Sequence, residues 1–318
     1  MGMNIQGLHH ITAIASEPQK NYDFYTEILG LKLVKKTINF DDPGTYHLYF
    51  GDQSGAPGTI MTFFLWPGAR RGVIGKGQAT VSSFEVPADS LAYWRKRFAK
   101  LNVPIELKAH RFGEEALAIN DPDGLKLELV GVEETTKNGW ENGSIPGEYA
   151  IRGFHGVTLS IDQNQRSERL LTEIMGYRKI DESSERVRYS TEQKSVGSYL
   201  DILIQPTHSP GRMGAGTVHH VAFRAQSDAE QVEWREALIK NGFDVSPIMD
   251  RTYFHSIYFR EPGGVLFEIA TDPPGFLLDE TLEGLGSELK MPSWLEPRRT
   301  LLEETLPSLK TRRPGDSQ

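Results

Sequence analysis

The sequence predicts an α+β protein made of four βαβββ modules, which form two paired, curled mixed sheets. Two observations carry this prediction. First, a short apolar strand, an amphipathic helix ending near a glycine and several further strands follow one another four times along the 318 residues. Second, the pairs His9-His10 and His219-His220 open two of these modules at matching positions. Because one module cannot cover its own apolar face, we expect the modules to pack in pairs.

The first module covers residues 7–65. Its opening strand ends at Ala15, and a helix begins at Pro18 and stops at Gly30. Turns rich in glycine and proline then separate three strands, expected around residues 32–40, 45–50 and 59–65.

The second module covers residues 78–132. It opens with a strand at 79–86 and ends with an apolar strand at 125–130. Between them, a helix beginning near Asp89 places Leu91, Trp94 and Phe98 on one face. Polar, glycine-rich residues 133–151 read as a linker between an N-terminal domain, 5–132, and a C-terminal domain, 152–272.

The C-terminal domain holds the third module, 153–206, and the fourth, 216–271. The third has a helix ending at Met175-Gly176. In the fourth, Ser227 and Glu230 form a capping box, and Gly242 lies just past the end of the helix. A tail rich in proline and charge follows at 273–318.

Composition limits the chemistry. Asp and Glu number 43 against 35 Lys and Arg, and the signs are mixed along the chain, so we expect no nucleic-acid partner. No apolar run is long enough to span a membrane and no leader opens the chain, which predicts a cytoplasmic protein. The sequence leaves a homo-oligomer open. Cysteine is absent, so a metal could be held only by His, Asp or Glu.

The register of the modules selects three ligands. His10 and His220 occupy the same position in their opening strands, and Glu128 and Glu268 occupy the same position in their closing strands. Only the fourth module has both a histidine and a glutamate. The set His10, His220 and Glu268 therefore requires module 1 to pair with module 4, leaving module 2 with module 3. Two histidines and a carboxylate with open coordination positions are typical of non-haem Fe(II) sites, where Mn(II) or Zn(II) could substitute.

The evidence that the remaining histidines or Glu128 bind a metal is weaker. Since side chains alternate along a strand, each histidine next to a ligand should face the other side of the sheet. We expect Glu128 to be solvated or salt-bridged. A structural role is expected for His155, which falls in the register of the non-ligands, and for three histidines without evident partners, namely His47, His110 and His208.

These motifs resemble the vicinal oxygen chelate superfamily, and more narrowly its hydroquinone ring-cleaving dioxygenases. The resemblance rests on segments in matching order: 8–12, 46–50, 57–59, 152–155, 219–220 and 262–268. It implies Fe(II) at His10, His220 and Glu268, with O₂ and a small aromatic compound as substrates. It also implies that five residues act beside the metal: His9, Thr12, His219, Arg251 and Tyr258.

Two other functions stay open. A glyoxalase-like lyase or isomerase acting on thiol adducts would use the same fold, but such sites usually have a second carboxylate, and none stands near Met61 or Thr62. A protein that binds quinones or aromatic drugs without turnover would need the cavity and not the metal.

Overall fold

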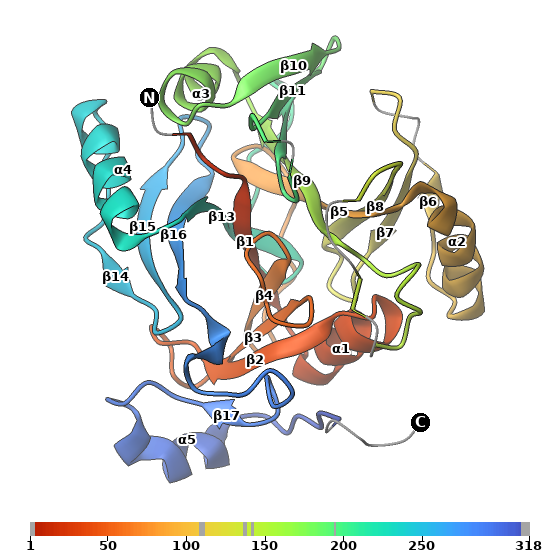
Figure 1. The fold of residues 1–318 in the computed structure, drawn as a ribbon, viewed down its shortest axis with the longest axis vertical. Coiled ribbons are helices and arrows are strands. Elements are labelled where there is room, and N and C mark those ends of the chain that lie inside the picture. The colour runs from red at the N-terminus through yellow and green to blue at the C-terminus, as the bar shows by residue number, and fades with distance from the viewer. Residues whose placement is uncertain (1–3, 108–111, 136–138, 141–142, 194, 313–318) are drawn as a thin grey trace.

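The computed structural model describes residues 4–107, 112–135, 139–140, 143–193 and 195–312. Within them, the chain forms two curled mixed sheets, one of nine strands and one of eight (Figure 1). The predicted α+β class and the two-sheet architecture are confirmed.

The first sheet holds the strands of modules 1 and 4. In spatial order they are β14 (Met249–Asp250), β15 (Phe254–Arg260), β16 (Leu266–Pro274), β13 (Thr217–Ala225), β1 (Leu8–Ala15), β4 (Ile60–Leu65), β3 (Tyr46–Gly51), β2 (Lys32–Ile38) and β17 (Leu289–Lys290). The last of these comes from the tail.

The second sheet holds the strands of modules 2 and 3. Their spatial order is β10 (Arg178–Glu182), β11 (Arg186–Ser190), β12 (Tyr199–Ile204), β9 (Gly153–Ile161), β5 (Gln78–Pro87), β8 (Lys126–Val132), β7 (Ala116–Asn120) and β6 (Glu106–Leu107).

Among the described residues, each module contributes one α-helix and the tail adds a fifth. They are α1 (Pro18–Asp23), α2 (Leu91–Lys100), α3 (Gln165–Arg169), α4 (Asp228–Lys240) and α5 (Arg299–Thr305), and α1 and α3 each continue as a π turn at Phe24–Ile28 and Leu170–Ile174. Trp94 of α2 and Trp234 of α4 are completely buried. At the start of α4, the backbone N–H of Glu230 donates to Ser227 Oγ at 3.2 Å, as the capping box predicts. None of the helices in the described part of the chain is long and apolar enough to cross a lipid bilayer.

The predicted pairing of modules is confirmed. β1 of module 1 runs antiparallel to β13 of module 4, and β5 of module 2 runs antiparallel to β9 of module 3. Residues about 210 positions apart in sequence therefore face one another in the first sheet, where β1 and β13 lie side by side (Figure 1). The division of the chain into domains 5–132 and 152–272 stays a prediction.

The pairing of β1 with β13 is irregular at two points. Leu8 lies opposite Phe223 and His10 opposite Ala222, so His9 is an extra residue in β1. Thr12 lies opposite His220 and Ala13 opposite Val218, so His219 is an extra residue in β13. Each is a β-bulge, which breaks the regular alternation of side chains.

The tail returns to module 1. β17 pairs in parallel with the end of β2, and Phe276 and Leu285 are buried in a small apolar cluster with Tyr49 and Phe254. Figure 1 shows this segment running along the edge of the first sheet. The tail therefore adds the edge strand to the sheet that modules 1 and 4 form.

Candidate metal centre

Three side chains from three adjacent strands meet inside the first sheet. His10 comes from β1, His220 from β13 and Glu268 from β16. Glu268 Oε2 lies 2.9 Å from His220 Nε2 and 3.4 Å from His10 Nε2, and the two Nε2 atoms are 3.3 Å apart. All three side chains are buried. The structure thus brings together the three residues that the register selected.

The donor atoms fit a bound metal ion. Glu268 Oε1 accepts a hydrogen bond from Ser256 Oγ at 2.5 Å, whereas Oε2 is buried without a hydrogen-bond partner in the described structure. A buried carboxylate oxygen without a donor is costly, and a cation between it and two imidazole nitrogens removes that cost. Among the described residues, this is the one group of three or more such side chains close enough to hold an ion.

Electrostatics keep Glu268 and His220 in the protonation states that a bound metal requires. Burial alone would raise the pKa of Glu268, but the imidazoles of His10 and His220 outweigh it and hold this pKa well below its usual value. Burial lowers the pKa of His220. At neutral pH, Glu268 is therefore an anion and the His220 side chain is neutral, so both can donate electron pairs.

The neighbouring histidines support the ligands from the side of Nδ1. His9 Nδ1 lies 2.9 Å from His10 Nδ1, and His219 Nδ1 lies 2.8 Å from His220 Nδ1. The expectation that they face the opposite side of the sheet is wrong, because the bulges rotate them toward the ligands. Burial lowers the pKa of His9 well below its usual value and that of His219 to about 3.

A cavity of about 420 Å³ opens beside the three donors. This volume lies in the range of small-molecule sites. The walls are mostly aromatic and apolar, and include Phe40, Tyr49, Phe64, Trp66, Phe254 and Leu266. Seven polar or charged side chains line the cavity besides the three donors, namely Asn39, Asp41, Asp42, His47, His219, Arg251 and Tyr258. The cavity can therefore hold a flat aromatic ring with one polar edge toward His10, His220 and Glu268.

Arg251 and Tyr258 form one unit on the wall of this cavity. Arg251 Nε donates to the Tyr258 hydroxyl at 3.2 Å, and Arg251 Nη1 pairs with Asp41 Oδ2 at 3.2 Å. The Tyr258 ring packs edge-on against His220, with centroids 5.7 Å apart. Burial raises the pKa of Tyr258, so its hydroxyl stays protonated at neutral pH and can donate a hydrogen bond.

One chain of hydrogen-bonded side chains that leads away from the cavity wall was not expected from the sequence. Tyr49 OH lies 2.9 Å from His47 Nδ1, His47 Nε2 lies 2.7 Å from Thr62 Oγ1, and Thr62 Oγ1 lies 3.0 Å from Thr12 Oγ1. The prediction that His47 lacks partners is therefore wrong, since both of its ring nitrogens have one. His47 also lines the cavity. The period-two spacing of His47 and Tyr49, two residues facing one side of a strand, is the signal that could have found it.

Glu128, His155 and His208 do not line this cavity. Glu128 is fully buried and accepts a hydrogen bond from Ser83 Oγ at 2.8 Å, so it is not solvated, and the alternative of a salt bridge stays a prediction. His155 Nε2 lies 3.0 Å from Glu114 Oε1, in keeping with a structural role. His208 is exposed, and His110 lies outside the described residues.

The fold and the site define a class: paired βαβββ modules that enclose a cavity with two histidines and a glutamate at its inner end. Residues 7–129 and 153–269 match the Glyoxalase/Bleomycin resistance protein/Dioxygenase superfamily, and the chain belongs to it.

The names of individual similar proteins specify a narrower class. The chain is 50% identical to the Bacillus subtilis (strain 168) protein named "Putative ring-cleaving dioxygenase MhqO", over 96% of this chain and 97% of that one. It is 34% identical to a chlorohydroquinone/hydroquinone 1,2-dioxygenase of Sphingobium indicum, over 95% of this chain and 96% of that one. A crystal structure from Bacillus subtilis subsp. subtilis str. 168, titled a "putative dioxygenase", superposes with a TM-score of 0.94 at 48% identity, covering 98% of this chain and 100% of the other.

Proposed function

We propose that this protein is an Fe(II)-dependent dioxygenase that cleaves the ring of hydroquinone-type or catechol-type substrates with O₂. The observation that carries the proposal is the set of donors from His10, His220 and Glu268 at the inner end of an aromatic-walled cavity. The names of relatives that align over nearly the whole chain point to the same reaction.

His10, His220 and Glu268 would hold the ion. When bound, Fe(II) supplies a redox-active, Lewis-acidic centre with coordination positions free for a phenolic oxygen and for O₂. Their buried setting excludes bulk water, and each histidine ligand has a neighbouring imidazole at Nδ1 that fixes its tautomer and ring plane.

The side chains on the walls orient the substrate. The Nδ1 of His219 accepts from His220 Nδ1, and no described residue hydrogen-bonds its Nε2, so the Nε2–H of this neutral imidazole would donate a hydrogen bond to a substrate oxygen. Tyr258 donates a hydrogen bond to the opposite edge of the ring, and the Arg251 guanidinium stabilises negative charge that develops there. Thr12 acts indirectly, as the end of the polar chain through Thr62 and His47.

The direct test is anaerobic reconstitution with Fe(II), followed by oxygen uptake and product analysis with hydroquinone, methyl- and chlorohydroquinones and catechols. We expect consumption of one O₂ for each ring opened, with loss of activity in His10→Ala, His220→Ala and Glu268→Gln. Absence of uptake with every one of these substrates would refute the proposed reaction. A His10→Ala variant that kept its iron would refute the ligand set.

A further inference from the structure

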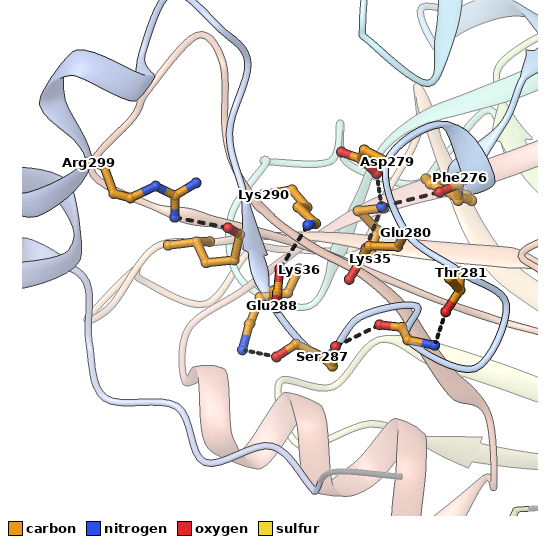
Figure 2. A network of polar contacts seen from close by, with 12 residues as sticks. Lys35, Lys36, Phe276, Asp279, Glu280, Thr281, Ser287, Glu288, Lys290 and Arg299 are labelled. Atoms are coloured by element: carbon orange, nitrogen blue, oxygen red, sulfur yellow. Dashed lines mark hydrogen bonds and ion pairs between the residues drawn. The ribbon is translucent and has the colours of Figure 1, made fainter.

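Lys35 of β2 is a fully buried cation whose hydrogen-bond and ion-pair partners, among the described residues, come from the tail. Its side chain is 0% exposed, although an ammonium group away from water requires close counter-charges. Lys35 Nζ lies 2.6 Å from Asp279 Oδ1, pairs with the Glu280 carboxylate and donates to the Phe276 carbonyl at 3.3 Å (Figure 2). One lysine thus fixes the segment that follows β16.

The second oxygen of Asp279 holds another residue. The Tyr253 hydroxyl donates to Asp279 Oδ2 at 2.9 Å, and Lys35 Nζ lies 4.6 Å from the centre of the Tyr253 ring. Tyr253 also packs against Phe276, with ring centroids 5.2 Å apart, and is 2% exposed. We refer to Lys35, Asp279 and Tyr253 as the tail clamp.

The tail clamp holds Tyr253, which belongs to a turn with a strained backbone. Thr252, next to Tyr253, has φ +69°, a left-handed conformation that a β-branched residue rarely adopts. Such a conformation persists where the surroundings over-determine it. Around Thr252, the N–H of Tyr253 donates to Arg251 O at 2.8 Å, and the N–H of Gly275 donates to Tyr253 O at 2.9 Å.

This turn carries two residues of the cavity. Arg251 precedes Thr252 and reaches Tyr258, whereas Phe254 follows Tyr253 and lies against the ligand His10, with ring centroids 5.1 Å apart. The left-handed residue between them sets the direction in which each side chain leaves the backbone. A shift of the turn toward an ordinary conformation would therefore move both walls of the cavity.

We propose that Lys35 is a positioning residue of the active site, acting through Asp279 and Tyr253 to hold the turn at Thr252 so that Arg251 and Phe254 face the substrate. The inference rests on the proposed function for its consequence in catalysis, but the clamp itself is a property of the chain without metal or substrate. The tail is then part of the catalytic apparatus and not only a cover for the sheet edge.

The main test uses Tyr253→Phe, which removes one hydroxyl and keeps the ring packed. In the metal-free protein, we expect backbone amide hydrogen exchange of residues 249–255 to accelerate about tenfold, because a hydrogen bond to a charged group is lost. In the Fe(II)-loaded protein, ring cleavage should lose about tenfold in kcat/KM while the iron content stays that of wild type. Tyr189→Phe is the matched control. Tyr189, in the second sheet, is also buried, and its hydroxyl is hydrogen-bonded to Asn164.

Rescue separates positioning from simple loss of stability. Asn tolerates the left-handed region far better than Thr, so Thr252→Asn in the Tyr253→Phe background should restore slow exchange and most of the kcat/KM. Lys35→Met should accelerate exchange of the same residues. Combined with Tyr253→Phe, it should accelerate exchange little further, because both substitutions act through Asp279. If Lys35→Met does not fold, Asp279→Asn takes its place.

Two results would overturn the clamp. One is unchanged amide exchange at residues 249–255 in Tyr253→Phe, and the other is a Thr252→Asn/Tyr253→Phe variant whose exchange is as fast as that of Tyr253→Phe alone. Additive effects of the Lys35 and Tyr253 substitutions would overturn the role of Lys35. If wild type opens no ring, the proposed reaction fails, yet the exchange experiment on the metal-free chain still decides whether the clamp exists.

Discussion

His9 and His219 show how one extra residue in a strand places a second imidazole beside each proposed histidine ligand. In a regular strand, each would face away from its neighbour, but the bulges place their Nδ1 atoms 2.9 and 2.8 Å from those of His10 and His220. A ligating imidazole carries its proton on the nitrogen that does not face the metal, so His9 and His219 must accept and must stay neutral. Burial, which lowers the pKa of both, ensures this.

Replacing either acceptor should weaken the metal site without removing a ligand. For His219→Phe, we expect the metal dissociation constant to rise about 10- to 100-fold, because His220 Nδ1 loses its acceptor. Competition with a chelator of known affinity measures this. His208→Phe, at an exposed position, is the control, and affinity equal to wild type in His219→Phe would contradict the pairing.

His47→Phe should cost stability even in the absence of metal. The substitution leaves the buried Thr62 hydroxyl and the Tyr49 hydroxyl without their imidazole partner, at a cost of about 1–3 kcal/mol in the free energy of unfolding. Urea unfolding of the metal-free protein checks the value. A loss below a few tenths of a kcal/mol would mean that these hydroxyls find other partners.

At the scale of elements, the closing turn of module 2 contains a buried acid. Asp121 Oδ1 accepts the backbone N–H groups of Asp123 at 2.9 Å and Leu125 at 2.8 Å, and Glu261 Oε1 accepts that of Val265 at the matching turn of module 4. Burial raises the pKa of Asp121 from 3.8 to about 7. The turn is therefore held by a carboxyl group that ionises near neutral pH.

This shift gives the stability of wild type a defined pH dependence. The unfolded chain releases the Asp121 proton near pH 4 and the folded chain near pH 7, so the folded state binds more protons in that window and its stability falls as pH rises. Asp121→Asn cannot ionise and keeps the acceptor oxygen. Its stability relative to wild type should rise between pH 4 and 7, by at most roughly 4 kcal/mol, and level off above. Urea unfolding across this range tests the prediction, and a constant difference would contradict it.

Regular features of the sequence predicted most of the elements and the three candidate ligands. The repeat register aligned His10 with His220 and identified Glu268, because side chains at equivalent positions of repeated modules occupy equivalent places. Bulges lay beyond this reasoning, since an extra residue in a strand leaves no periodic signal. For the same reason, the register alone misplaced His9 and His219.

At the scale of the whole molecule, the tail was the least predictable part. Nothing near Lys35 in the sequence indicates that its partners are Asp279 and Glu280, almost 250 residues later. Such pairing depends on the three-dimensional path of residues 275–290, which have no periodic pattern. The pairing of module 1 with module 4 was predictable only because a metal site demanded it.

The halves of the chain should not bind metal separately. A fragment of residues 1–132 has His10 but lacks His220 and Glu268, and its β1 has no antiparallel partner. We expect no metal binding by this fragment alone, and recovery when it is co-expressed with residues 133–318. Elemental analysis of the purified fragments and of their complex measures this. Binding by the first fragment with the affinity of the full chain would contradict the proposed site.

The pairing of β1 with β13 also sets an order of events during synthesis. The first strand, β1, leaves the ribosome about 200 residues before its antiparallel neighbour, β13. The edge of β1 that pairs with β13 therefore stays unpaired while modules 2 and 3 are synthesised. Contacts so distant in sequence slow folding. A nascent chain consequently has no three-donor site with which to capture a metal ion until nearly all of module 4 has been translated.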